Sequence, residues 1–276
     1  SVISNSVVSN ASILFISLAL VMQFLFPIAL VIYFYRKYKI SIAAVFTGAL
    51  VFLVFQILTR IPLLSIAQRS PWFQNLASNN LLLLSLLLAF TAGLFEEGGR
   101  YLGFNFILKN KLEWKNGIAF GIGHGGLESM YIGLTNFNNL IISLMINAGT
   151  FDSVIAPLLP AETAQSIKEQ LISIEPTTFL AGGVERISTI FIQIGLSMIV
   201  LYAVKNKKVV YLFLAIAIHT IIDLPVLFIV EYLGIWGAEI AIAILAVISA
   251  ILTFKSKSYF EHETNNQNIE APEPDL

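Results

Sequence analysis

Residues 81–108 read LLLLSLLLAFTAGLFEEGGRYLGFNFIL, an apolar run long enough to cross a bilayer that carries two adjacent glutamates and an arginine. An ionisable side chain at the centre of a bilayer costs about 2.5 kcal/mol or more. Such residues almost always pair with each other, face a water-filled cavity or do chemistry. The stretch with Glu96, Glu97 and Arg100 is therefore the first place to look for function.

The composition of the chain indicates a membrane protein. Hydrophobic residues make up 57% of the 276 residues and charged residues only 12%, which is more apolar surface than a soluble domain of this length can bury. Apolar runs of about 20 residues recur, whereas the alternating pattern of a transmembrane barrel is absent. We predict an all-α fold, a polytopic transmembrane helical bundle.

We expect about seven spanning helices on the basis of apolar length. They fall at residues 11–35, 41–64, 81–108, 117–135, 177–204, 209–230 and 235–254. Basic clusters follow four of these helices, at residues 36–39, 109–115, 205–208 and 255–257. Because positive residues concentrate on the cytoplasmic side, the N-terminus is expected outside and the C-terminus in the cytoplasm.

Residues 140–160 are also apolar, but an eighth crossing there would move the 205–208 cluster outside. We therefore expect an extension of the fourth helix or a segment at the outer surface. The apolar stripe formed by Ile167, Leu171 and Ile174 predicts a short interfacial helix. Residues 1–260 are expected to form one membrane domain, followed by a disordered acidic cytoplasmic tail at 261–276.

Glycines recur every fourth residue on two of the predicted helices. Gly117, Gly121 and Gly125 lie on the fourth helix, and Gly99 and Gly103 on the third. Small residues at this spacing let helix backbones approach closely in a membrane. We expect the third and fourth helices to touch.

Three pairs of ionisable residues are spaced four apart within predicted spans, so each pair projects from one face of its helix. They are Glu96 and Arg100, His124 and Glu128, and His219 and Asp223. Counting a rise of 1.5 Å per residue from the basic face places Glu97, His124 and His219 at depths of roughly 14–18 Å. The pairs can therefore meet at one level.

Carboxylates and imidazoles that converge inside a membrane can activate water, either directly or through a metal ion. The alternative is a purely structural role, in which these residues form ion pairs that hold helices together. We expect that role for Glu185 and Arg186 near the outer face. The sequence contains no HExxH, HxxEH or GxSxG motif, and it has no cysteine. Glutamate and histidine chemistry remains.

Three motifs now carry a resemblance: EEGGRY at 96–101, GIGHGGLE at 121–128 and HTIID at 219–223. Together they resemble the YhfC family of intramembrane proteases and, more distantly, the PrsW proteases and the CAAX prenyl protease superfamily. The resemblance covers residues 10–255. It implies a helical bundle with a water-filled cavity open to the cytoplasmic side, in which an intramembrane peptide bond is hydrolysed.

The resemblance also implies roles for single residues. Glu96 corresponds to the general base, and His124 helps to hold the attacking water. His219 and Asp223 position water or stabilise the oxyanion. The predicted catalytic set comprises Glu96, Glu97, Arg100, His124, Glu128, His219 and Asp223, in which Arg100 pairs with Glu97.

The cofactor stays open between no metal and zinc. If a metal is held, the motifs offer Glu96, His124, His219 and Asp223 as ligands. Gln193 lies at the same depth on the fifth helix, and glutamine is a poor zinc ligand. We therefore expect activity that does not need a tightly held zinc ion.

The leading functional hypothesis is an intramembrane endopeptidase of glutamic or metal-assisted type in a bacterial plasma membrane, acting on a membrane protein or peptide. The alternative is a non-enzymatic role as a transporter, proton or cation pathway, or bacteriocin-immunity or partner-binding protein, with the same buried cluster. The net charge of −1 gives no reason to expect a nucleic-acid partner.

Overall fold

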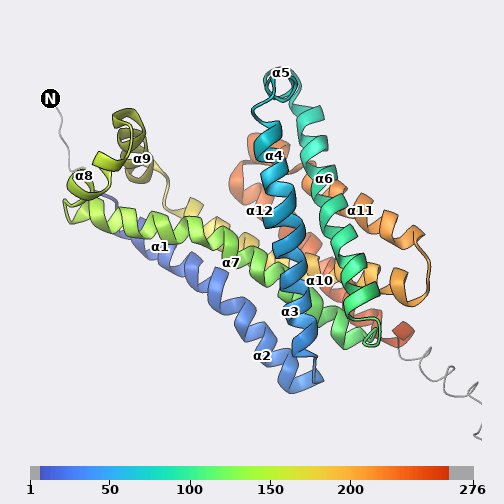
Figure 1. The fold of residues 1–276 in the computed structure, drawn as a ribbon. Coiled ribbons are helices and arrows are strands. Elements are labelled where there is room, and N and C mark those ends of the chain that lie inside the picture. The colour runs from blue at the N-terminus through green and yellow to red at the C-terminus, as the bar shows by residue number, and fades with distance from the viewer. Residues whose placement is uncertain (1–6, 261–276) are drawn as a thin grey trace, which may run out of the picture.

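The structure, a computed structural model, describes residues 7–260 apart from the side chain of Leu227. Within that range every regular element is a helix (Figure 1), which confirms the predicted all-helical class. The tail predicted at residues 261–276 lies outside the described residues.

The elements are long helices, several of them continued by wider π-helical turns labelled η, and one short 3-10 turn, η4. In chain order they are α1 (Asn10–Leu20), η1 (Val21–Leu25), α2 (Phe26–Tyr38), α3 (Ile42–Val51), η2 (Phe52–Arg60), α4 (Ile61–Ala67), α5 (Pro71–Asn79), α6 (Leu81–Leu102), η3 (Gly103–Ile107), α7 (Trp114–Asn147), α8 (Phe151–Val154), η4 (Ala156–Leu158), α9 (Ala161–Ser173), α10 (Thr177–Lys205), α11 (Val210–Asp223) and α12 (Val226–Lys255). Figure 1 shows α3, η2 and α4 as one continuous rod beside α6, with α5 joining their ends.

Among the described residues, five helical stretches are long and apolar enough to cross a bilayer. A sixth is added if α7 and the short helices after it are taken as one bent span. The helix α11 has 14 residues, fewer than the roughly 20 that a perpendicular crossing needs. The count of seven spans and the orientation of the termini therefore stay predictions.

The helix predicted at 209–230 is broken in two, so this boundary was wrong. α11 ends at Asp223 and α12 begins at Val226. Pro225 lies between them and has no N–H to donate to the carbonyl four residues earlier. α12 is itself kinked at Gly234, whose φ of 70° is readily available only to glycine.

The fourth helix extends far beyond its predicted end at residue 135. α7 runs to Asn147, and the chain then bends by 108° into the short helices at Phe151–Leu158. The predicted extension of the fourth helix is thus confirmed for residues 140–147. The following helix α9 packs its apolar stripe, including Ala164 and Leu171, against the ends of α1 and α7.

Glycines set the position of α7 between two neighbours, although they face other helices than expected. A Cβ on Gly117, Gly121 or Gly125 would lie against side chains or backbone of α10. On the other side, a Cβ on Gly123 would collide with the carbonyl oxygen of Val45 in α3. The expected contact between the third and fourth helices is confirmed at Gly103, where a Cβ would lie 3.0 Å from the ring of Phe120 in α7, and by the stacked rings of Phe104 and Phe120 at 4.4 Å. The glycines of α7 do not make that contact, because they bring α7 to α10 and α3 instead.

Candidate active site

Glu96 lies near the middle of α6 and is almost fully buried, with 3% of its surface exposed. Its Oε1 accepts a hydrogen bond from Gln56 Nε2 at 2.7 Å. Its Oε2 lies 3.0 Å from His124 Nε2 and 3.3 Å from Gln193 Nε2. The carboxylate is therefore fixed in orientation by side chains from three other elements.

His124 is placed by the close crossing of α7 with α3. A Cβ on Gly48 of α3 would lie 2.9 Å from the backbone nitrogen of His124, so only glycine permits this approach. The ring of Phe52 meets the imidazole edge to face at 5.2 Å. His124 is fully buried, and its Nδ1 has no hydrogen-bond partner within residues 7–260. Its polar contact is the one that Nε2 makes with Glu96.

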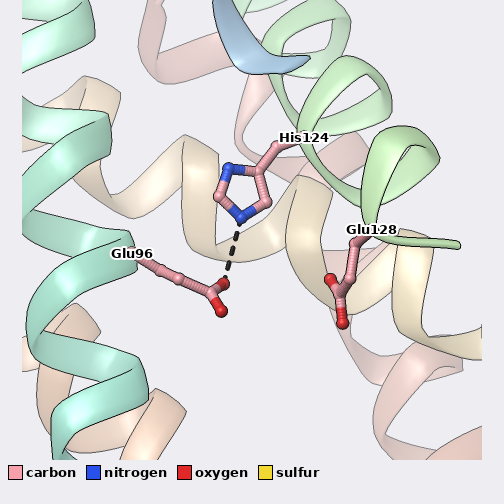
Figure 2. A group of neighbouring side chains, drawn as sticks. All are labelled: Glu96, His124 and Glu128. Carbon is pink, nitrogen blue, oxygen red and sulfur yellow. Dashed lines mark hydrogen bonds and ion pairs between the residues drawn. The ribbon is translucent and has the colours of Figure 1, made fainter. Parts of the chain in front are cut away.

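Glu128 follows His124 by about one turn of α7, and Figure 2 shows its carboxylate on the same side of the helix, facing the region between His124 and Glu96. Its Oε2 accepts a hydrogen bond from Gln193 Nε2 at 2.7 Å, and its Oε1 accepts one from Arg186 at 2.8 Å. Gln193 thus links two carboxylates through one amide group.

Arg100 is fully buried beneath this cluster. Its guanidinium donates to the main-chain oxygen of Gln193 at 2.7 Å, to the side-chain oxygen of the same residue, and to Ser197 Oγ at 2.8 Å. Its Nε lies 3.3 Å from Glu97, as the resemblance implied, and its Nη2 lies 3.5 Å from Glu96. Arg100 therefore holds both glutamates and joins α6 to α10.

His219 on α11 takes the second glutamate. Its Nδ1 lies 2.7 Å from Glu97 Oε1, and its Nε2 lies 3.4 Å from Asp223 and 4.0 Å from Glu96 Oε2. A Cβ on Gly93 would lie 2.9 Å from the Ile216 carbonyl, so this glycine allows α11 to approach α6 at that level. The two imidazoles therefore contact different members of the adjacent glutamate pair.

Of these groups, Glu96, Glu128, Gln193, His219 and Asp223 line a cavity of about 410 Å³, which we call the polar cavity. Its charged lining residues are Glu96, Glu128, Glu185, Asp223, Arg60 and Arg186. From Glu96 it extends past Leu88 of α6 toward the α5 end of the bundle, which the basic residues predict to be outside. The resemblance implied a cytoplasmic opening, and for this cavity the two expectations cannot both hold.

The sequence reasoning missed two residues of the site, Gln56 and Arg60. Arg60 Nη1 donates to Gln56 Oε1 at 3.1 Å, and Gln56 in turn donates to Glu96. Both lie on η2. The signal in the sequence was a glutamine inside an apolar span, where a polar side chain usually pairs with another polar group. Glu185 and Arg186 form the predicted pair, and Arg186 also contacts Glu128.

The donor set fits a divalent cation. One ligand atom each from Glu96, His124 and Glu128 lie within 4.8 Å of one another. The polar cavity is lined by four carboxylates, two guanidinium groups and the imidazole of His219, so the negative groups outnumber the positive ones even when that imidazole is charged, which favours a cation. His219 and Asp223, which the motifs offered as ligands, lie outside that group. Metal-bound histidines usually donate their second N–H, a contact that His124 does not make with any residue of 7–260, so binding would be weak.

Comparison with known proteins supports the motif assignment. Residues 22–248 match the family described as YhfC intramembrane metalloprotease. A Bacillus subtilis (strain 168) protein described as "Uncharacterized membrane protein YhfC" is 36% identical over 260 residues, which cover 92% of this chain and 100% of that protein. No solved structure matches. Together with the apolar helices, the likeness to a membrane protein confirms a multi-pass integral membrane protein.

Proposed function

The chain belongs to the YhfC intramembrane metalloprotease family, and we propose that it is an endopeptidase that hydrolyses a peptide bond of a membrane protein at the polar cavity. The observation that carries this proposal is the buried contact of 3.0 Å between Glu96 and His124, beside the polar cavity that Glu96 lines. A carboxylate held in this way is a competent general base for water.

Oε1 of Glu96 is the atom best placed to take the proton. Among the described residues it accepts one hydrogen bond, from Gln56, whereas Oε2 is contacted by both His124 and Gln193. Because each carboxylate oxygen offers two lone pairs, Oε1 keeps one for water in the cavity that Glu96 lines.

The bond changes follow from that assignment. Water loses a proton to Glu96 as its oxygen bonds to the carbonyl carbon of the peptide. The carbon–nitrogen bond then breaks, and the proton held by Glu96 passes to the leaving nitrogen. His219, in its imidazolium form, would donate from Nε2 to the oxygen that becomes negative, while Glu97 holds Nδ1.

A divalent cation fits beside these groups. Held by Glu96, His124 and Glu128, it would act as a Lewis acid that polarises the carbonyl and lowers the energy of hydroxide. The chain's own contribution is to orient the ligands: Gln193 spaces the two carboxylates, and Arg186 anchors Glu128.

A proton or cation pathway is the second candidate, and the acidic lining of the polar cavity favours it. A pathway needs polar groups from one face to the other. The polar cavity is instead bordered by Ile192, Leu196 and Ile222, beyond which lies an apolar cavity. Ion flux into liposomes that depends on Glu96 and occurs without hydrolysis of any protein would favour the pathway.

The protease proposal is tested by comparing cells that make the wild-type protein with cells that make Glu96→Gln. Mass spectrometry of new peptide termini should reveal membrane proteins that are cut only in the presence of the wild type. Glu169→Gln makes the same chemical change on the exposed surface of α9 and serves as the matched control. Identical termini in the cells with the wild type, Glu96→Gln and Glu169→Gln would show that none of the detected membrane proteins is a substrate. Absence of hydrolysis by the purified wild-type protein as well would refute the proposal.

A further inference from the structure

A second cavity, of about 460 Å³, lies over α10 between α11 and α12. We call it the apolar cavity, because side chains such as Met198, Leu214, Ile218, Leu245, Ile248 and Leu252 line it. It has the size of a typical ligand pocket. Hydroxyl groups such as those of Tyr202, Tyr211 and Ser256 belong to its lining, but the surface that it presents is almost entirely apolar. None of the charged residues that line the polar cavity lines it.

The two walls of the apolar cavity are anchored on different neighbours. α11 is drawn to α6 by the close approach at Gly93. α12 is tied to α10 by Ser249 Oγ, which donates to the Phe191 carbonyl at 2.7 Å, and to α7 by Trp114, which donates to the Thr253 carbonyl at 2.8 Å. Because α11 is held by α6 while α12 is held by α10 and α7, the two walls do not close on each other and the space between them over α10 stays open.

The apolar cavity is accessible from the side. Leu214, Ile248 and Leu252 are 45%, 47% and 60% exposed, so each presents surface outward as well as into the cavity. In a membrane such surface faces the hydrocarbon of the lipids. An apolar segment can therefore enter without leaving the bilayer.

The apolar and polar cavities meet. Ile192, Leu196 and Ile222 line both, so only the width of these side chains separates the two spaces. Along α10 the lining changes from apolar near Tyr202 to charged near Arg186. This order suits a peptide whose apolar side chains lie in the apolar cavity and whose backbone groups reach the hydrogen-bonding residues of the polar cavity.

We propose that the apolar cavity binds the transmembrane segment of the peptide substrate and leads its backbone past Ile222 to Glu96. The inference rests on the proposed function, because it names how a membrane-embedded substrate reaches that site. A lipid acyl chain would fill the same apolar lining, but it has no peptide group to account for the junction with the polar cavity.

Binding can be measured without hydrolysis. The probe is a synthetic leucine-alanine transmembrane peptide with lysine ends and one photoreactive leucine, reconstituted in liposomes with the Glu96→Gln protein. Cross-links should map to α11 and α12 residues that line the apolar cavity, and unlabelled peptide should compete. In Ile248→Trp we expect the cross-linking yield to fall about tenfold, because a larger side chain overfills the apolar site.

Val247→Trp is the matched control. Val247 is the preceding residue, is 59% exposed and does not line the apolar cavity, so its yield should equal that of the parent protein. Equal yields in both tryptophan variants, or cross-links spread over all lipid-facing helices, would overturn the proposal. Displacement of the cross-links by phospholipid carrying a photoreactive acyl chain, with no competition by peptide, would assign the cavity to lipid and overturn it too.

The failure of this inference is distinguishable from failure of the proposed function. Hydrolysis of fluorogenic casein in detergent, lost in Glu96→Gln but kept in Val247→Trp, tests the catalytic groups alone. If casein is cut and the peptide does not cross-link at α11 and α12, the catalytic proposal holds and the substrate route is wrong. If the peptide cross-links at α11 and α12 and no protein is ever cut, the substrate route holds and the catalytic proposal is wrong.

Discussion

His219 Nδ1 lies 2.7 Å from Oε1 of Glu97, a glutamate with no exposed surface. Adjacent residues on a helix point about 100° apart, so the carboxylates of Glu96 and Glu97 can face different neighbouring helices. Glu96 faces His124 of α7, and Glu97 faces His219 of α11. The glutamate pair therefore divides between two helices and fixes two imidazoles, of which His219 lines the polar cavity.

Glu97 and His219 should act as a unit. We expect Glu97→Ala and His219→Ala each to reduce the rate of casein hydrolysis. The double variant should be only slightly slower than the less active single variant, with a coupling energy of roughly 0.5–3 kcal/mol. Glu97→Gln retains an oxygen that can accept from Nδ1, so it should keep more activity than Glu97→Ala. Purely additive losses would show that the contact does not position His219.

Replacing Glu96 tests the general base. Glu96→Gln should lower the hydrolysis rate by about 10²–10⁴-fold, because the amide cannot take a proton from water. The free energy of unfolding should fall by roughly 1–3 kcal/mol. The amides of Gln56 and Gln193 both donate to the carboxylate of Glu96, and in the variant one of these donors would face the NH₂ group of the new side chain instead of an oxygen. Hydrolysis at the native rate would exclude Glu96 as the base, and Glu169→Gln controls for the charge change.

Gln193 holds the cluster together without carrying charge. Gln193→Leu keeps a similar volume but removes the donor to Glu96 and Glu128 and the acceptor for Arg100. We expect this variant to lose about 1–3 kcal/mol in the free energy of unfolding for each buried group left unpaired. Gln170→Leu on exposed α9 is the control. Equal melting temperatures for the two variants would contradict the bridging role.

Metal binding is expected to be weak. Purified protein dialysed against a chelator should contain less than stoichiometric zinc and keep its activity, because the histidine of the donor group lacks the second hydrogen bond that tightens such sites by about 10–100-fold. Added zinc should still raise the melting temperature, and Glu128→Gln should abolish that rise. Tightly held zinc whose removal and return switch activity off and on would prove the expectation wrong.

The orientation of the bundle can be read by labelling. The chain has no cysteine, so single cysteines report without background. Asn75→Cys on α5 should react with an impermeant reagent outside intact cells, whereas Lys109→Cys beside the basic cluster should react only after permeabilisation. Cysteines at positions 5 and 265 should label on opposite sides. Labelling of these two on the same side would mean an even number of crossings.

The sequence alone was sufficient for the class of the protein and for most members of the candidate site. Apolar runs long enough for a bilayer require helices, because backbone groups in lipid must be satisfied within the segment. Charged residues inside such runs are costly, which singled out Glu96, His124 and His219 before any packing was known. Their spacing of four from a second polar residue predicted common faces, which is a local property of a helix.

The partners of these residues were decided only by tertiary structure. Which carboxylate each imidazole contacts, and the grouping of Glu128 with Glu96 and His124, depend on the rotation and crossing of the helices. The close approaches of Gly48 to α7 and of Gly93 to α11 set those crossings. The residues around a glycine in the sequence do not indicate which helix will pack against it. The inclusion of Gln56 has the same cause: side-chain contacts between helices arise from packing over the whole bundle, whereas sequence periodicity reports only the helix on which a residue lies.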